Sequence, residues 1–221
     1  MSAPVSVIIA ARNEDAHIGA VVDSAFAAGA DEVIVADGSS VDQTREIAAS
    51  GGATVIECEP MRARQFNAGA RAARNEALIF LHADTTLPPG AARAVVDALQ
   101  TSSFGGFHVQ FAEPHRRLRF VAFMINRRTR FTRCPWGDQA QFVSRARFLA
   151  DGGFRDIPIM EDYELAVRMK RESVLLPLTV TTSGRRFLTR GLVRTTVLNW
   201  TIIAAWRLGI TADTLASWYR R

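Results

Sequence analysis

The chain has 221 residues, of which 48% are hydrophobic and 22% are charged. This balance is ordinary for one globular domain with a sizeable core, and it argues against extensive disorder. The formal net charge is +5, and arginine supplies nearly all of the positive charge because Lys170 is the only lysine. A basic chain suits a phosphorylated ligand, an acidic lipid or a nucleic acid, so the charge alone selects none of them.

The two cysteines and the N-terminal segment indicate a cytoplasmic protein. Cys58 and Cys134 lie far apart, without CxxC spacing or paired histidines, which fits neither a disulfide framework nor a zinc site. Residues 1–4 carry no basic group and lead directly into an apolar run at residues 5–10. That run is too short for the apolar core of a signal peptide, so we expect it to be the first strand.

The first half of the chain alternates between strand-like and helix-like segments. Gly29 suits a left-handed helix cap, and Ser39 or Ser40 is expected to cap the second helix. The alternation predicts a largely parallel sheet with intervening helices. The expected strands are residues 5–10, 32–36, 54–57 and 77–82, and the expected helices are residues 16–28, 41–50, 62–73 and a segment ending at 99 that residues 88–90 open.

The second half has a less regular pattern. The expected elements there are a strand at residues 105–111, an arginine-rich amphipathic helix at 116–133, a loop at 136–139 and a strand at 140–144. No Pro/Gly/Ser-rich linker and no internal repeat interrupts the chain. We therefore expect one domain over residues 1–190, followed by a helical extension over residues 191–221.

The helical extension contains an apolar stretch whose charges lie too close together for a membrane span. Arg194 and Arg207 bracket a segment shorter than the ~20 residues that a spanning helix needs. This stretch is expected to dock on the domain or to contact a membrane interface. The arginine-rich helix has the same two readings, because a basic amphipathic helix binds anionic lipid or simply packs one face and solvates the other.

Acidic residues follow two of the predicted buried strands, and an acidic pair occurs later. Asp37 ends one apolar run, Asp84 ends another, and Glu161 and Asp162 stand together far along the chain. In an open α/β sheet, ligands bind where the carboxyl ends of strands meet. No GxGxxG motif follows the first strand and no GxxxxGK[ST] loop occurs, which argues against dinucleotide-dependent hydride transfer and P-loop hydrolysis.

Several segments, taken in order, resemble the family 2 glycosyltransferases over about residues 4–190. The resemblance implies an α/β fold of the GT-A type, with a mostly parallel central sheet flanked by helices, and an inverting transfer of a sugar. The short length and two segments, 62–70 and 136–139, are similar to a bacterial branch often labelled arsenosugar-type glycosyltransferases. The segments that carry the family resemblance are residues 5–14 (VSVIIAARNE), 34–40 (IVADGSS) with Asp42 and Thr44, 62–69, 81–85 (LHADT) and 161–162.

The resemblance also assigns roles in catalysis. Asp162 corresponds to the general base that takes the proton of the acceptor hydroxyl, and Glu161 is expected to orient that base or touch the acceptor. Asp84 corresponds to the last acid of an Asp-x-Asp element that binds a divalent cation, Mn²⁺ or Mg²⁺. His82 stands where the family has the first acid of that element, and imidazole favours ions of the manganese type.

The donor implied by the resemblance is a UDP- or GDP-linked sugar, and the acceptor is a small molecule or a lipid-linked compound. Asp37 is expected to bind the base or ribose of the nucleotide, and Trp136 is expected to offer a face to a sugar ring. The remaining substrate-binding residues implied are Ala11, Arg12, Asn13, Glu14, Arg62, Arg64, Asn67, His82, Ala83, Gly137, Asp138, Gln139, Arg185 and Arg186.

Other interpretations remain open from the sequence. Asp37 and Asp162 also fit local helix or turn caps, and His82 also fits a histidine packed at a strand end. A non-catalytic nucleotide- or membrane-binding protein on the same scaffold is the main alternative function. Nucleotidyl transfer ranks lower because residues 11–14 are not a glycine-rich loop, and nucleic-acid binding lacks any recognised motif.

Overall fold

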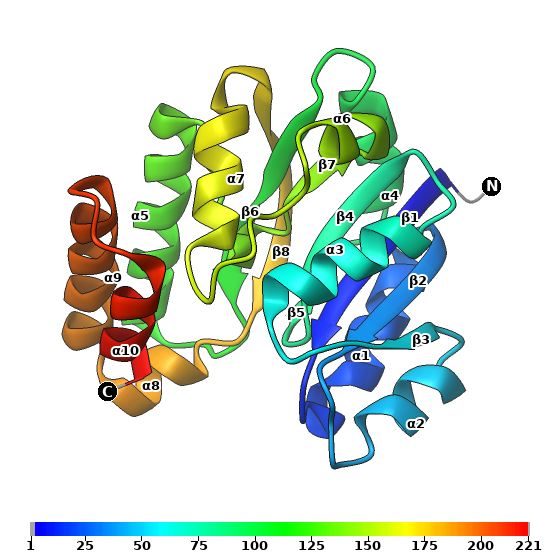
Figure 1. The fold of residues 1–221 in the computed structure, drawn as a ribbon, viewed down its shortest axis with the longest axis horizontal. Coiled ribbons are helices and arrows are strands. Elements are labelled where there is room, and N and C mark those ends of the chain that lie inside the picture. The colour runs from blue at the N-terminus through cyan, green and yellow to red at the C-terminus, as the bar shows by residue number, and fades with distance from the viewer. Residues whose placement is uncertain (1–2, 221) are drawn as a thin grey trace.

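The computed structural model describes residues 3–220 and places their strands in one mixed sheet with helices on both faces (Figure 1). The strand order is β3-β2-β1-β4-β7-β6-β8-β5. The strands are β1 (Ala3–Ala11), β2 (Ala30–Asp37), β3 (Thr54–Glu57), β4 (Ala77–His82), β5 (Thr85–Thr86), β6 (Phe104–Phe111), β7 (Phe142–Ser144) and β8 (Ser173–Thr182).

The helices alternate with these strands in the first half of the chain and dominate its end. They are α1 (Asp15–Ala27), α2 (Thr44–Ser50), α3 (Arg62–Ala72), α4 (Ala91–Ala98), α5 (Arg116–Thr132), α6 (Arg145–Ala150), α7 (Glu161–Met169), α8 (Arg185–Arg190), α9 (Leu192–Arg207) and α10 (Ala212–Arg220), with short 3₁₀ turns η1 (Gly137–Gln139) and η2 (Lys170–Glu172).

The strands β1 to β4 pair in parallel, as the alternating pattern predicts, and β6 pairs in parallel with β8. The strand β7 is antiparallel to both β4 and β6, and β5 is antiparallel to β8. The sheet is therefore mostly parallel, and the α/β prediction is confirmed. The parallel order brings the carboxyl ends of β1, β2 and β4 to the same edge of the sheet.

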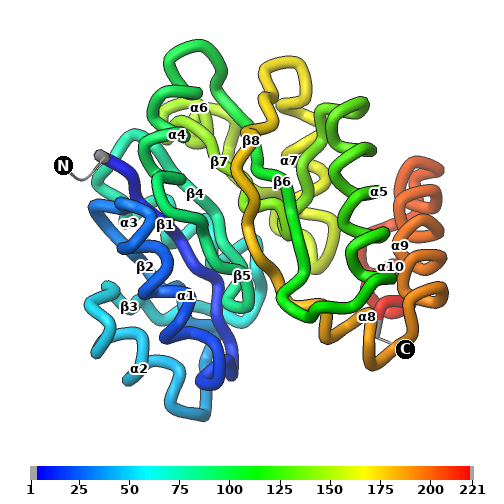
Figure 2. Tube along the Cα trace, turned by 180° about the vertical axis from the view of Figure 1, so that it is seen from behind, coloured from blue at the N-terminus to red at the C-terminus, as the bar shows by residue number. Residues whose placement is uncertain are grey.

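Alternation along β1 divides the core between the two faces of the sheet. Val7 and Ile9 pack in a cluster with α1 and α4, whereas Ile8 packs with α3 and Phe80 on the opposite face. Figure 1 views the face that α3 covers, and Figure 2 shows α1 and α4 from behind. This alternation follows from the two-residue period of a strand that is buried on both sides.

The C-terminal helices share a third apolar cluster with the loop that leads into α7. Ile202 and Ile203 of α9 and Leu215 of α10 pack together with Met160 and Tyr163. In both views α9 and α10 lie beside α5, at the end of the molecule opposite β3 (Figures 1 and 2). The division at residue 190 stays a prediction. None of the helices within residues 3–220 has the length and apolar character needed to cross a bilayer.

The predicted start of the second helix is wrong. The helix α2 begins at Thr44, and Gln43 precedes it without a side-chain cap. Ser40 does not serve as the cap because its hydroxyl donates to the Asp37 carboxylate and accepts from the Asn13 amide. Residues 38–43 therefore form a loop between β2 and α2, and hydrogen bonds to Asn13 join this loop to the segment that follows β1.

Candidate active site

A cavity of about 750 Å³ lies beside the carboxyl end of β4 and the start of α7. Ionisable residues from four separate segments of the chain meet at its polar end. These are Arg62 of α3, His82 and Asp84 at the end of β4, Asp138 of η1 and Asp162 of α7. The parallel sheet thus brings Asp84 and Asp162, which are far apart in the sequence, to one cavity.

His82 is held as a neutral imidazole at the end of β4. Its ring stacks on Phe66, with centroids 6.2 Å apart and planes 14° from parallel. Burial, together with the positive charge of Arg62, lowers the pKa of His82 to about 4. The Nε2 atom is buried and has no hydrogen-bond partner among the described residues. An uncharged ring with a free nitrogen is suited to a metal ion or a substrate hydroxyl.

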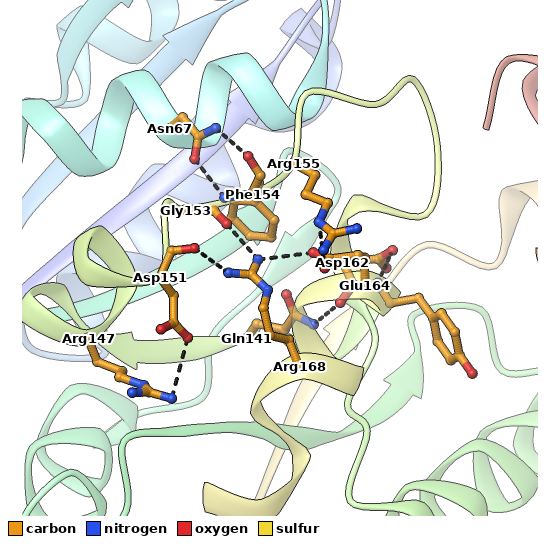
Figure 3. Close-up of polar contacts among 11 residues, drawn as sticks. Asn67, Gln141, Arg147, Asp151, Gly153, Phe154, Arg155, Asp162, Glu164 and Arg168 are labelled. Atoms are coloured by element: carbon orange, nitrogen blue, oxygen red, sulfur yellow. Dashed lines mark hydrogen bonds and ion pairs between the residues drawn. The ribbon is translucent and has the colours of Figure 1, made fainter. Parts of the chain in front are cut away.

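Asp162 lies in the first turn of α7, where the helix dipole favours a negative charge. One carboxylate oxygen, Oδ2, accepts a 2.7 Å hydrogen bond from the Gly137 amide, and Oδ1 accepts from the Tyr163 amide at 2.7 Å. Gln141 donates to the backbone carbonyl of Asp162 at 2.8 Å (Figure 3). It also donates to the Pro135 carbonyl at 2.8 Å. These bonds fix the carboxylate against the loop that carries η1.

Gly137 stands where any side chain would meet the reactive groups. A Cβ atom added to it would lie 2.7 Å from Nε2 of His82 and 3.0 Å from Oδ2 of Asp162. These distances are shorter than real Cβ contacts, so glycine keeps the imidazole and the carboxylate in their positions. The closeness of Gly137 to His82 and Asp162 is the structural support for the prediction that Gly137 belongs to the site.

Glu161 is buried, with only 1% of its surface exposed, and does not line the cavity. Its Oε1 lies 2.8 Å from Nε of Arg62. Burial raises the pKa of Glu161, and the Arg62 guanidinium acts in the opposite direction. The carboxylate therefore holds Arg62 at the cavity wall instead of facing a ligand directly.

Asp138 projects into the cavity with its Oδ1 atom buried and unpaired within residues 3–220. Burial raises the pKa of Asp138 to about 6, while the nearby Arg128 lowers it and the charge of Asp162 raises it. Arg128 lies over the Trp136 ring at 3.3 Å from its centroid and donates to Oε1 of Gln139 at 3.0 Å. Trp136 thus lines the cavity with the Arg128 guanidinium over one face of its ring.

The sequence analysis did not single out Arg128 as a site residue. Burial lowers the pKa of this guanidinium to about 10. It stands three residues after Ile125, which packs against the core, and one before the buried Thr129. Helical spacing from these two residues places Arg128 on the inner side of α5, and this was the signal available in the sequence.

The first loop and Asp37 are joined by hydrogen bonds at the ends of β1 and β2. Asp37 is fully buried, and its Oδ2 accepts from the Ser40 amide at 2.9 Å. Asn13 accepts from the Val41 amide through Oδ1, at 2.9 Å. Gln65, another residue that the sequence analysis missed, donates to the carbonyls of Ala11 and Ala36. Asp37 therefore organises this turn, and its contact with a nucleotide stays a prediction.

Two arginines of α8 connect the first loop to the cavity. Arg185 lies 3.7 Å from the Glu14 carboxylate, and both Arg185 and Arg186 line the cavity. Arg186 donates to the Tyr219 hydroxyl, and burial lowers its pKa. Burial also raises the pKa of Glu14. Arg12 is exposed and Ala83 is buried, and neither lines the cavity.

Three of the predicted substrate-binding residues have structural partners away from the cavity. Arg64 is paired with Asp156 at 2.7 Å. Asn67 exchanges two hydrogen bonds with the backbone of Phe154, at 2.8 and 2.9 Å (Figure 3). Gln139 is fully buried and donates to the Phe107 carbonyl. None of the three lines the cavity, so their contact with substrate stays a prediction.

The groups around Asp84 fit a cation that is shared with a phosphorylated ligand. In the described part of the chain, no three His, Cys, Asp or Glu side chains are grouped to hold a metal ion by themselves. Asp84 offers a carboxylate, and His82 offers an unpaired neutral nitrogen at the same strand end. Divalent cations that bind nucleotides commonly take one or two protein ligands and complete their shell with phosphate oxygens and water.

Comparison with solved structures identifies the fold. The first 349 residues of S. aureus TarS match with a TM-score of 0.65 and 16% identity, over 83% of this chain and 60% of that one. Glucosyl-3-phosphoglycerate synthase from Mycobacterium tuberculosis, solved with Mn²⁺, UDP-glucose and phosphoglyceric acid, matches with a TM-score of 0.64 and 18% identity, over 94% of this chain and 80% of that one. The TarS fragment was also solved with UDP-GlcNAc. The likeness shows the GT-A fold.

The family follows from the sequence comparison. No curated protein matches the chain. Residues 6–144 match Glycosyl transferase family 2, and this region contains the first loop, Asp37, Asp84 and Asp138. The match covers more than half of the chain, with the expected fold around it. The chain therefore belongs to glycosyl transferase family 2.

Proposed function

We propose that this protein is a glycosyltransferase that moves a sugar from a UDP- or GDP-linked donor to an acceptor hydroxyl, with inversion at the anomeric carbon. The observation that carries the proposal is the meeting of Asp84 and Asp162 at one cavity. The structural neighbours support the donor class, because TarS was solved with UDP-GlcNAc and the mycobacterial synthase with UDP-glucose. The inversion is carried over from the family resemblance.

In the proposed reaction, Asp162 accepts the proton of the attacking hydroxyl. The hydroxyl oxygen forms a bond to the anomeric carbon, and the bond from that carbon to the diphosphate oxygen breaks. The nucleoside diphosphate leaves with the electron pair. Because the Gly137 and Tyr163 amides hold the Asp162 carboxylate, it does not need to reorganise when the acceptor arrives.

The charge that develops on the leaving diphosphate needs positive partners. Arg62, Arg185 and Arg186 line the cavity and are suited to bidentate contacts with phosphate oxygens. Glu161 holds Arg62 in place through the 2.8 Å ion pair. Asp84 and His82 would hold a divalent cation, Mn²⁺ or Mg²⁺, which when bound neutralises part of the diphosphate charge.

Calorimetric titration with UDP, GDP and their sugars, with Mn²⁺ and with chelator, tests the donor site. We expect one nucleotide class to bind in the presence of metal, and Asp84→Ala to abolish the metal-dependent part. Asp97→Ala is the matched control, because Asp97 is exposed on α4 and its carboxylate pairs with Arg93. Failure of every nucleotide to bind would overturn the donor assignment.

A second variant tests the base. Asp162→Asn keeps the shape of the side chain but cannot accept the proton. We expect donor binding to be retained and turnover to fall by a factor of about 10² to 10⁴. Asp156→Asn, at an exposed position that pairs with Arg64, is the control and should keep full turnover. Full turnover by Asp162→Asn would remove Asp162 from the role of base.

A further inference from the structure

The cavity does not end at the charged residues but continues as an apolar groove between α5 and α9. The two helices lie side by side in both views (Figures 1 and 2). Each contributes apolar side chains at helical spacing, so one face of each helix is turned toward the other. The lining residues are Phe120, Val121, Met124, Ile125 and Phe131 of α5 and Leu192, Val193, Val197, Trp200, Ile202 and Ile203 of α9.

Large apolar side chains in this groove remain open to solvent. Phe120 is 63% exposed, Phe131 is 74% exposed and Val193 is 76% exposed. The sequence pattern of the arginine-rich helix predicts one packed face and one solvated charged face, but the solvated face of α5 also carries Phe120 and Phe131. Contiguous exposed apolar surface of this kind is typical of a binding site. A ligand that covers the groove would remove it from water.

The groove has the form of a site for one ligand. The whole cavity, with its charged end, is about 750 Å³, which lies in the usual range of small-molecule sites. The apolar part opens onto the same space as His82, Asp84 and Asp162. A molecule in the groove therefore has one end at the proposed reaction centre and the other among the side chains of α5 and α9.

Charge favours an anionic group at the polar end of that molecule. The described residues that line the cavity include five arginines and three aspartates. Burial holds one of these carboxyls, Asp138, partly protonated near neutral pH, since its pKa is raised to about 6. Arg127 reaches the cavity from α5, on the side of the apolar residues, and lies 5.8 Å from the Phe131 ring centroid. The arginine there is available to an acceptor as well as to a donor diphosphate.

We propose that the acceptor is an amphiphile, with a long apolar chain in the groove between α5 and α9 and an anionic head group whose hydroxyl reaches Asp162. This inference rests on the proposed function, because it names the acceptor for the same reaction. The head group supplies the attacking oxygen, and its proton passes to Asp162 as in the reaction above. The apolar chain supplies affinity and positions the head group.

Binding of alkyl phosphates tests the groove without relying on turnover. Octyl and dodecyl phosphate are titrated calorimetrically, below the concentrations at which they form micelles, and inorganic phosphate is titrated alongside. Each buried methylene contributes about 0.8 kcal/mol, or about fourfold in affinity. Dodecyl phosphate has four more methylenes than octyl phosphate, so we expect it to bind about 200-fold more tightly if all four are buried, and at least about tenfold more tightly if half of them are. Inorganic phosphate should bind more weakly than either.

Variants in the groove test where the apolar chain of the alkyl phosphate binds. Met124→Glu and Val197→Glu place a carboxylate in the groove at positions that are already exposed, so folding should be unaffected. We expect each variant to weaken the binding of dodecyl phosphate by about tenfold, because the alkyl chain would then lie against a charge. Phe123→Glu on α5 and Leu208→Glu, at the residue that directly follows α9, are matched controls, since both residues are exposed and neither lines the cavity. The controls should bind as tightly as the unchanged protein.

Two outcomes would overturn the proposal. Equal affinity for octyl and dodecyl phosphate would mean that no chain enters the groove. If all four variants weakened the binding of dodecyl phosphate equally, and the protein bound to anionic phospholipid vesicles, α5 and α9 would form a membrane contact and not an acceptor site. Donor titrations with the same variants separate this inference from the proposed function. If the donor still binds but the affinity for alkyl phosphates does not depend on the length of the alkyl chain, only the amphiphilic acceptor is rejected.

Discussion

At the scale of single residues, the site depends on carboxylates placed in different environments. Asp162 is tied to two backbone amides, whereas Asp138 has a buried oxygen that lacks a partner in the described structure. Both line the same cavity. Hydrogen bonds from amides stabilise an ionised carboxylate, and burial without such bonds favours the protonated form. Burial accordingly raises the pKa of Asp138 to about 6, so this carboxyl loses its proton only as the pH approaches neutrality.

The raised pKa of Asp138 predicts a stability that depends on pH. The carboxyl has a pKa of about 6 in the folded protein and 3.8 ordinarily, so between these values the folded state binds more protons than the unfolded state. The free energy of unfolding should therefore fall as pH rises through this window, by up to about 3 kcal/mol. Asp138→Asn removes the penalty, so the variant should gain stability relative to the unchanged protein above pH 6.

Denaturant unfolding at several pH values measures this effect. The difference between the two free energies of unfolding isolates Asp138, because the other titrating groups are common to both proteins. That difference should be small near pH 4 and should grow up to about pH 7. A difference that stays constant over the range would mean that the Asp138 carboxyl titrates at its ordinary pKa.

Gly137→Ala tests the spacing of the reactive groups. The new Cβ would lie 2.7 Å from His82 Nε2, so the imidazole, the loop or Asp162 must shift. A displacement of about 1 Å at a reaction centre lowers turnover by about a hundredfold. We expect that loss in a steady-state assay, with a far-UV circular dichroism spectrum that is unchanged. Turnover equal to that of the unchanged protein would show that this contact does not position the site.

At the scale of elements, the helix α3 lies unusually close to β1. Gly69 allows this approach, since a Cβ added there would lie 2.3 Å from Cγ2 of Ile8. Gly69→Ala should therefore lower the free energy of unfolding by about 1–3 kcal/mol. The same substitution in an Ile8→Ala background should cost less, because the clashing methyl group is absent. A double-mutant cycle measured by denaturant unfolding gives the comparison, and strict additivity would contradict the contact.

Local patterns were sufficient to predict most elements of the first half of the chain. The strand β4 occupies the predicted residues 77–82, and Gly29 has the left-handed backbone expected of it, with φ of 94°. These elements are specified by apolar runs and by glycine, which are local signals. The start of α2 was predicted wrongly because Ser40 bonds to Asp37 and Asn13, and those partners come together only in the folded sheet.

The candidate site shows the same division between local and long-range information. Asp84 was singled out by its position after a predicted strand, and the resemblance assigned roles to Asp84 and Asp162. The structure places both at the cavity. Arg64 and Asn67 were selected by the resemblance, yet they bond to Asp156 and Phe154, about ninety residues later. A segment's pattern says which face it buries, but it does not say which distant loop crosses that face. The apolar groove likewise needs α5 and α9 together, so neither helix alone could predict it.

At the scale of the whole molecule, the C-terminal helices are built into the support of the site. Tyr163 follows Asp162 directly, accepts a 2.9 Å hydrogen bond from Arg207 of α9, and packs in the cluster that contains Leu215. Met160, in the left-handed conformation with φ of 72°, precedes α7 in the same cluster. The helices α9 and α10 thus contact both neighbours of the Glu161–Asp162 pair, and loosening them should affect catalysis.

Leu215→Ala tests this coupling. Leu215 is fully buried, so the cavity left by truncation should lower the free energy of unfolding by about 2–5 kcal/mol. If α9 and α10 unfold together with the sheet, denaturation remains a single transition and turnover falls even under conditions where the protein is folded. Leu208→Ala, at a position that is 84% exposed, is the control and should change neither quantity. A separate early transition with unchanged turnover would mean that the C-terminal helices form an independent unit that does not position Asp162.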